Sequence, residues 1–220
     1  MVVLALLVVG ILVLLVLGPR VRGTPAERRL CVALAVSNLV FGTLSTVTGM
    51  VPFDVKTSLP LQICGFAWIV VAWALLGRGP TVTALTYFWG LTFGIQAMFE
   101  PTLTQPFPEP EFFWFFGKHM SMALGAVFLT IALRNGPDWR GYRRAVAWTL
   151  GWLIAVLFLN ALLGANYGYV SRKPSQHTVL DLFGPWPWYV VVEAFLTIIG
   201  WALMTVPWAG WPWRARRPVR

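Results

Sequence analysis

The chain of 220 residues is too apolar and too poorly charged to cover a globular surface in water. Apolar residues make up 58% of it and charged residues 11%, whereas soluble domains are about half apolar and about a quarter charged. The mean hydropathy of +0.70 and the length of the apolar blocks exclude a disordered chain and a soluble enzyme. Its 17 Lys and Arg against 8 Asp and Glu give a net charge of +9, which needs its own explanation.

Seven apolar blocks follow one another, each close to the ~20 residues that cross a ~30 Å hydrocarbon core. A signal peptide carries its basic residues before its apolar stretch, whereas here they follow the first block. This block is therefore expected to remain in the protein as a helix. We therefore predict an all-α fold, a bundle of seven transmembrane helices that forms one domain over 1–220. The helices are expected at about 1–18, 30–50, 60–77, 81–99, 112–133, 145–164 and 188–206, with a basic cytoplasmic tail over 207–220.

The basic residues fall mainly on one side of this predicted bundle. Thirteen of the 17 lie there and three lie on the other side, while Lys118 is inside a helix. Because positively charged loops stay in the cytoplasm, the N-terminus is predicted outside and the C-terminus inside. The net charge then reports orientation and attraction to anionic lipids, and no nucleic-acid partner is expected. The thirteen are Arg20, Arg22, Arg28, Arg29, Arg78, Arg134, Arg140, Arg143, Arg144, Arg214, Arg216, Arg217 and Arg220.

Two further features follow from this topology. The long loops 100–111 and 165–187 both face outward, so chemistry carried by loops is expected on the outer side. Fourteen of the 17 basic residues are Arg, a bias typical of bacterial chains from GC-rich genomes. A multi-pass protein of a bacterial plasma membrane, with membrane lipids as its partners, is the resulting expectation, and the sequence leaves the oligomeric state open.

Polar side chains inside the predicted helices are informative, because each needs a partner or a function in hydrocarbon. At ~1.5 Å per residue, polar residues of five helices lie about 5 to 10 Å below the outer helix ends. Asn38 is the exception, nearer the middle or the inner half of its helix. We expect a shared polar cavity in the outer leaflet, with separate interhelical hydrogen bonds as the alternative. The residues are Gln62, Cys64, Gln96, His119, Asn160 and Glu193.

Several of these residues allow two interpretations. His119 is either an interhelical hydrogen-bonding group, worth roughly 1 kcal/mol, or a chemical group. Lys118 and Glu193 fall at similar depth and are expected to neutralise each other, although Glu193 orienting His119 is an alternative. Cys64 is either a small buried side chain or a nucleophile that His119 deprotonates.

Other patterns are less specific. Cys31 is expected to be a buried side chain at the opposite membrane depth from Cys64, which excludes a disulfide between them. Gly90 and Gly94 form a GxxxG motif, which predicts close helix packing. The sequence has no GxSxG, P-loop or HExxH motif and too few Cys and His for a zinc cluster, so neither a cofactor nor a metal is expected.

Three strings carry a resemblance to a known family. They are YFWGLTFGIQAMFEPTL (87–103), FFGKH (115–119) and NALLGANYGYVSRKPSQHTVLDLFGPWPWY (160–189). With them, the stretch from about residue 59 to residue 189 resembles the YwaF-like integral membrane proteins of bacteria, relatives of transmembrane protein 164. The spacing of NY, KP and D..GPWPWY is the most specific part of the resemblance.

The resemblance implies a phospholipid acyltransferase or acyl hydrolase with a catalytic Cys and His. By motif, Cys64 in LPLQIC and His119 at the end of FFGKH take these roles, while Gln62 stands where the family pattern has His. A transporter or ligand-binding protein without catalysis, and a structural or assembly partner, are the alternatives. Candidates for substrate binding or for hydrogen bonds to an oxyanion are Gln62, Gln96, Asn160, Asn166, Tyr167, Asp181 and Glu193.

Overall fold

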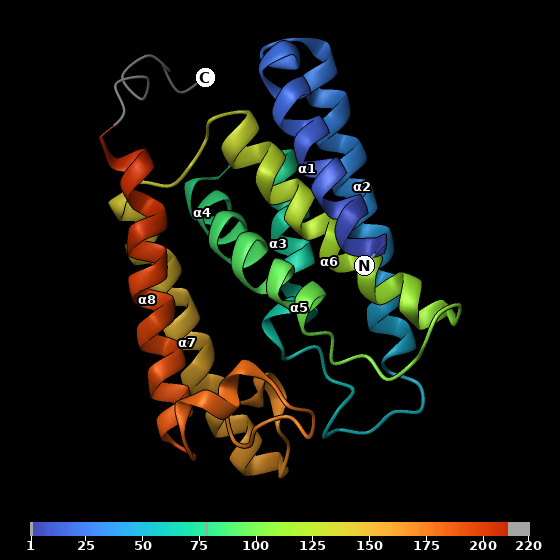
Figure 1. Ribbon diagram of the computed structural model, residues 1–220, viewed down its shortest axis with the longest axis vertical. Coiled ribbons are helices and arrows are strands. Elements are labelled where there is room, and N and C mark those ends of the chain that lie inside the picture. Colours follow the sequence, from blue (N-terminus) through green and yellow to red (C-terminus); the bar gives the residue numbers. More distant parts are fainter. Residues whose placement is uncertain (1, 78, 211–220) are drawn as a thin grey trace.

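The computed structural model describes residues 2–77 and 79–210, and within these ranges it contains helices and no strand. Seven helical rods follow one another, and Figure 1 shows them crossing the molecule in alternating directions. Six rods are long and apolar enough to cross a membrane, and the seventh is a shorter apolar helix, α3. A polytopic helical membrane protein is thereby confirmed. Five rods are α1 (Val2–Val21), α2 (Pro25–Thr48), α3 (Ile63–Gly77), α7 (Trp139–Leu163) and α8 (Trp188–Ala209).

The other two rods each contain a π-helical segment. The fourth rod consists of α4 (Pro80–Trp89), the π-helix η1 (Gly90–Gly94) and α5 (Ile95–Phe99). The fifth consists of α6 (Pro110–Ala126) and the π-helix η2 (Val127–Ala132). Short π-helical segments inside α-helices occur frequently at functional sites, because they shift backbone groups out of the regular ladder. Two 3-10 helices, η3 (Tyr167–Tyr169) and η4 (Val179–Phe183), lie in the long loop before α8.

Five predicted helix boundaries need correction. The first helix, expected to end at 18, continues to Val21, and the second, expected from 30, begins at Pro25, because proline suits the first helical position. The helix expected at 145–164 begins at Trp139, because Asp138 caps it by accepting a hydrogen bond from the backbone N–H of Gly141 (2.8 Å). The helix expected at 60–77 begins only at Ile63, after Pro60. The helix expected to end at 206 continues to Ala209 through Pro207, so the first residues of the predicted tail are helical.

The basic residues that the structure describes gather as the topology predicts. The α1–α2 turn and the link from η2 to α7 lie at one end of the bundle, which is also where α8 ends (Figure 1). These connections carry Arg20, Arg22, Arg28, Arg29, Arg134 and Arg140, whereas Lys56, Arg172 and Lys173 belong to loops at the other end. Arg78 and the C-terminal arginines from Arg214 onward lie outside the described residues.

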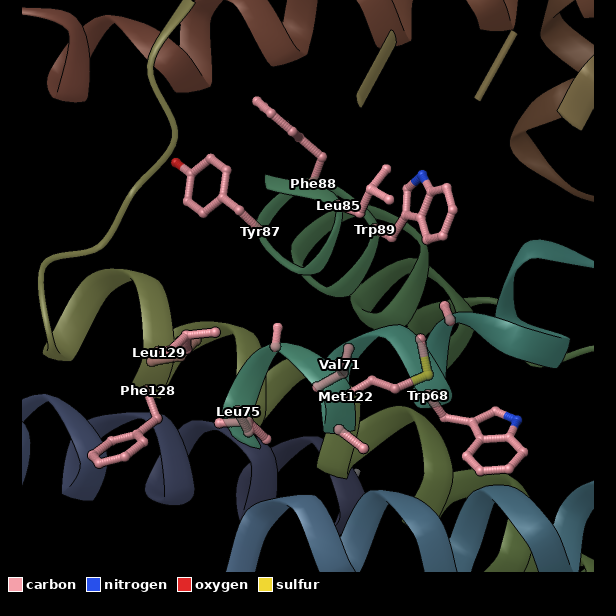
Figure 2. Packing of buried hydrophobic residues seen from close by; sticks show 14 of the residues in the cluster. Trp68, Val71, Leu75, Leu85, Tyr87, Phe88, Trp89, Met122, Phe128 and Leu129 are labelled. Atoms are coloured by element: carbon pink, nitrogen blue, oxygen red, sulfur yellow. The ribbon is translucent and has the colours of Figure 1, made fainter. Parts of the chain in front are cut away.

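The core lies around α4 and the middle of α6, while large apolar side chains on α1, α7 and α8 remain exposed. Six consecutive residues of α4, 84–89, are buried, so this helix is covered on all sides. Figure 2 shows Phe88 and Trp89 on one side of α4, and Met122 of α6 beside Val71 of α3. The exposed apolar faces of the peripheral helices suit contact with lipid rather than water.

The GxxxG motif lies where the fourth and fifth rods cross. A Cβ atom added at Gly90 would be 2.6 Å from the Cβ atom of Ala126 and 3.1 Å from the carbonyl oxygen of Met122. Since real Cβ atoms do not approach other atoms so closely, only glycine permits this crossing. Close packing at the motif is confirmed.

Aromatic side chains with polar atoms tie α7 and α8 to α4. The indole N–H of Trp89 donates to the hydroxyl of Thr149 on α7 (2.9 Å), and the Tyr87 hydroxyl donates to the carbonyl of Met204 on α8 (3.0 Å). Between the two C-terminal helices, the Tyr142 hydroxyl donates to the carbonyl of Ile198 (3.1 Å). These bonds lie mostly toward the inner half, which leaves the outer halves of α7 and α8 free to line a cavity.

Candidate functional site

A cavity of about 340 Å³ lies at the end of the bundle opposite the arginine-rich turns, beneath the loops that join α2 to α3, α5 to α6 and α7 to α8. We call this end the outer end, after the predicted topology. It is lined by side chains from six rods, and four of these rods contribute polar residues that the sequence placed at similar depth. Five predicted site residues line it, namely Gln62, Cys64, Gln96, His119 and Glu193. Lys118 lines it as well. Asn160, Asn166, Tyr167 and Asp181 are not among its lining residues.

Cys64 is the second residue of α3, and the shortness of this helix decides where the thiol lies. Fifteen residues span about 22 Å, less than a ~30 Å hydrocarbon core, so the outer end of α3 is recessed. The chain before it folds back closely, since a Cβ atom at Gly65 would be 2.9 Å from the carbonyl of Pro60. Cys64 thus combines partial exposure in the cavity with a helix N-terminus, whose dipole favours a thiolate.

The sulfur of Cys64 faces the fourth rod. It lies 3.9 Å from the carbonyl oxygen of Phe93, in the π-helical segment η1. A thiol at this distance donates a weak hydrogen bond, which holds the sulfur against η1. Nothing in the side-chain sequence points to this backbone oxygen, so sequence reasoning did not identify it.

His119 is 2% exposed and lies in α6. Its Nδ1 atom is 2.8 Å from the carbonyl oxygen of Phe115, and its ring packs on the Phe115 ring with centroids 4.4 Å apart. A carbonyl only accepts hydrogen bonds, so Nδ1 carries the proton and the neutral ring keeps its lone pair on Nε2. This arrangement leaves Nε2 as the basic atom of a fixed imidazole.

Lys118 and Glu193 face the same cavity from α6 and α8. The expected ion pair between them is wrong, because neither residue takes part in an ion pair within the part of the chain that the structure describes. Lys118 instead lies within electrostatic reach of both Cys64 and His119. The cavity therefore holds one cationic and one acidic side chain that do not neutralise each other directly.

Asn160, Asn166 and Tyr167 build the cap of the outer end. The side-chain amide of Asn160 donates to the carbonyl of Tyr167 (2.9 Å) and accepts from its N–H (2.8 Å). The Tyr167 hydroxyl accepts from the N–H of Leu59 (3.0 Å) and donates to the carbonyl of Val55 (2.7 Å). Asn166 donates to the carbonyl of Arg172 (2.8 Å). The cap thus joins the α2–α3 loop to the loop before α8.

Asp181 lies on the outer surface in η4, where it caps that short helix. It accepts from the backbone N–H of Thr178 (3.1 Å) and lies near His177 Nδ1 (3.3 Å) and Lys173 Nζ (3.6 Å). The Thr178 N–H, followed by His177 and Lys173, holds the pKa of this carboxyl below its ordinary value. η4 reaches the cavity through Leu180 and is joined to the end of the fourth rod, where Glu100 accepts from the N–H of Val179 (3.2 Å).

The donor set of the cavity suits acid–base and nucleophilic chemistry more than metal binding. No group of three or more His, Cys, Asp or Glu side chains that would hold a metal ion occurs among residues 2–77 and 79–210. What the cavity offers is a thiol from α3, an imidazole and an ammonium group from α6, and an amide from α5. A reacting carbonyl group needs a nucleophile, a base and groups that stabilise an oxyanion.

The sequence is similar to one protein family and to one bacterial protein. The sequence model described as the TMEM164 family matches residues 1–205. An uncharacterized protein of Treponema pallidum (strain Nichols) is 32% identical over 125 residues, which cover 55% of this chain and 50% of the relative. The match thus spans only half the length of that relative. No solved structure matches the chain.

Proposed function

Because this chain belongs to the TMEM164 family of membrane proteins, we propose that it transfers or hydrolyses an acyl group of a phospholipid. In this proposal Cys64 is the nucleophile and His119 is the general base. The observation that carries it is that a thiol at a helix N-terminus and a buried imidazole line one cavity at the outer end of the bundle. These are the two groups that thiol-based acyl transfer requires.

The reaction has two halves. Nε2 of His119 takes the proton of the Cys64 thiol, and the thiolate attacks the carbonyl carbon of a lipid ester. The ester C–O bond breaks, the leaving lipid alkoxide takes the proton back from His119, and a thioester remains on Cys64. His119 then deprotonates a second lipid hydroxyl, which attacks the thioester and breaks the C–S bond, while the thiolate regains the proton. Water as the second nucleophile makes the protein a hydrolase.

Two other groups of the cavity fit this chemistry. Lys118 lines the same cavity as Cys64, where an ammonium group favours a thiolate, and the Gln96 amide is a hydrogen-bond donor on the fourth rod. Such donors stabilise the negative charge that develops on the ester oxygen. Gln62, where the family pattern has His, supplies no base, so His119 alone acts as one in this proposal.

The proposed setting is a bacterial plasma membrane, with membrane lipids as partners. Its support is the set of long apolar helices and the similarity to a Treponema pallidum protein. A lipid ester lies near the headgroup region, and the polar end of the cavity lies at the outer end of the bundle. Substrate and proposed nucleophile then meet at similar depth.

The test is acyl exchange by the purified protein in phospholipid vesicles that contain a labelled acyl chain and an unlabelled lysophospholipid. We expect Cys64→Ala to abolish exchange and His119→Gln to slow it at least about a hundredfold, as loss of a general base does. Cys31→Ala is the matched control, since that cysteine is buried away from the cavity. A labelled acyl group on Cys64 that hydroxylamine releases would identify the thioester, whereas unchanged exchange in both site variants would refute the mechanism.

The unpaired Lys118 and Glu193 favour one alternative, a transporter or ligand-binding protein without catalysis. Two opposite charges in an apolar surrounding serve as counter-ions for a bound polar group. This alternative predicts that short-chain phospholipids raise the thermal stability of the protein without forming any product. Loss of that stabilisation in Lys118→Met, together with no exchange by the unaltered protein, would favour binding over catalysis.

A further inference from the structure

The cavity changes from polar to apolar along its length. At the outer end it is lined by His119, Lys118 and Gln96, but toward the middle of the bundle it continues along α7 and α8. From Val190 to Trp201 it follows α8 for about 16 Å, close to half of a ~30 Å hydrocarbon core. The deep part is lined mainly by Val146, Leu150, Leu153, Ala194, Ile198 and Trp201.

Glu193 lines the first part of this α8 stretch and belongs to the polar part of the cavity, so the apolar part along α8 runs from Ala194 to Trp201. The few polar groups at that depth do not make it a polar site. The hydroxyl of Thr149 donates to the carbonyl of Ala145 (2.9 Å) and accepts from the indole of Trp89 (2.9 Å), so its hydrogen bonds are made inside the protein. The hydroxyl of Thr197 is the other one that lines this stretch. An apolar extension below a polar reaction zone has the polarity profile of a phospholipid in the outer leaflet.

Trp201 lies at the deep end and is held in one position. It is 1% exposed, and its indole N–H donates to the hydroxyl of Thr92 in the π-helix η1 (3.0 Å). Its ring stacks on Phe88 with centroids 4.8 Å apart and meets the edge of Phe93 at 6.1 Å. An indole fixed by a hydrogen bond and two aromatic neighbours does not yield to a ligand without losing these contacts.

The same π-helix connects this deep end to the proposed nucleophile. The carbonyl of Phe93 accepts a hydrogen bond from the Cys64 thiol, and the ring of Phe93 contacts the ring of Trp201. The hydroxyl of the neighbouring Thr92 accepts a hydrogen bond from the Trp201 indole N–H. The distance from thiol to deep end is therefore fixed by one short segment of backbone. Figure 1 shows the fourth rod running obliquely between α8 and the α3 and α6 side.

We propose that the apolar extension holds the acyl chain of the substrate and that Trp201 forms its floor, which limits the chain length that Cys64 accepts. This inference rests on the proposed function. A chain whose carbonyl lies at Cys64 runs past Phe93 toward the middle of the membrane and ends against the indole ring. A methylene for which a pocket has no room is worth about a tenfold to a hundredfold loss of reaction rate.

Chemical modification of Cys64 tests the binding of an acyl chain in the apolar extension without requiring that the protein catalyse acyl transfer. In a Cys31→Ala background, a series of alkyl methanethiosulfonates from butyl to hexadecyl converts the Cys64 thiol into a mixed disulfide and releases methanesulfinate. We expect the rate to fall about tenfold or more per step beyond a limiting chain length. In Trp201→Leu this limit should move to longer chains, whereas Trp201→Phe, which keeps an aromatic floor, should shift it little.

Trp148→Leu is the matched control, because this tryptophan of α7 is 61% exposed and does not line the cavity. It should leave the limit unchanged. An unchanged limit in a folded Trp201→Leu, judged by a sharp thermal transition, would overturn the proposal even if the protein exchanges acyl groups. A shifted limit without any acyl exchange would instead keep the chain site and refute the proposed catalysis.

Discussion

Asn160 is a buried polar residue of a membrane helix whose side-chain hydrogen bonds are all made within the protein. It is 2% exposed, and its amide serves the N–H and the carbonyl of Tyr167 together with the hydroxyl of Ser171 (3.1 Å). Every polar atom of the side chain thus has a protein partner. A donor already engaged in this way is a poor candidate for stabilising an oxyanion that forms only during a reaction.

Replacing Asn160 by Ala tests this interpretation. The change leaves the backbone N–H and carbonyl of Tyr167 without partners, so the free energy of unfolding should fall by about 1–3 kcal/mol. The measurement is reversible unfolding in detergent, with Asn166→Ala as the control, since its bonds to Arg172 are exposed and should matter less. A stability equal to that of the parent chain, combined with an exchange rate about a hundredfold lower, would assign Asn160 to the reaction instead.

For single residues, the sequence predicted which side chains line the cavity more accurately than which side chains interact with one another. Residue depth followed from helix spacing, so the grouping of Cys64, Gln96, His119 and Glu193 was predictable. Pairing depends on which faces of different helices meet, and hydropathy carries no such information. For this reason the sequence paired Lys118 with Glu193, whereas the structure leaves both facing the cavity.

Among the helices, the fourth rod decides the shape of the molecule. Its α-helical part is buried on all sides, its π-helical part meets both Cys64 and Trp201, and its glycines allow α6 to approach. Because Gly90 is the first residue of η1, the close crossing with α6 at Gly90 and the position of the Phe93 carbonyl are coupled. Disturbing the crossing should therefore affect the cavity as well as stability.

Gly90→Ala should destabilise the protein by about 1–3 kcal/mol, since its Cβ atom has no room beside Ala126. Gly200→Ala is the control, because a Cβ atom there meets nothing within 4 Å and alanine favours a helix. Thermal unfolding of both variants in the same detergent makes the comparison. Equal transition temperatures would mean that α6 moves away at no cost and that the crossing is not tightly constrained.

The sequence predicted the number of helices more accurately than their ends. Apolar length is set by the membrane and is visible in hydropathy, so all seven rods were expected. Helix ends depend on local capping and loop packing, and these moved the start of α7 to Trp139 and that of α3 to Ile63. The late start of α3 matters most, because it recesses Cys64 into the bundle. The π-helices were not predicted, since no side-chain pattern marks an extra residue in a turn.

The cavity and most of the described arginines lie at opposite ends of the molecule. The loops that cover the cavity are the α2–α3, α5–α6 and α7–α8 connections, whereas the arginine-rich turns lie at the far end (Figure 1). If positively charged connections stay in the cytoplasm, the proposed reaction takes place at the external leaflet. The orientation thus decides which pool of phospholipid meets Cys64.

Single cysteines in a Cys31→Ala, Cys64→Ala background test this orientation in intact cells. Gln105→Cys and Ser175→Cys lie in exposed loops at the cavity end, and Thr24→Cys and Arg140→Cys lie at the arginine-rich end. A membrane-impermeant maleimide should label the first pair in intact cells and the second pair only after permeabilisation. Arg140→Cys removes one of the many arginines at its end, so the charge difference that sets the orientation persists. Labelling of the second pair alone in intact cells would reverse the topology and move the reaction to the cytoplasmic leaflet.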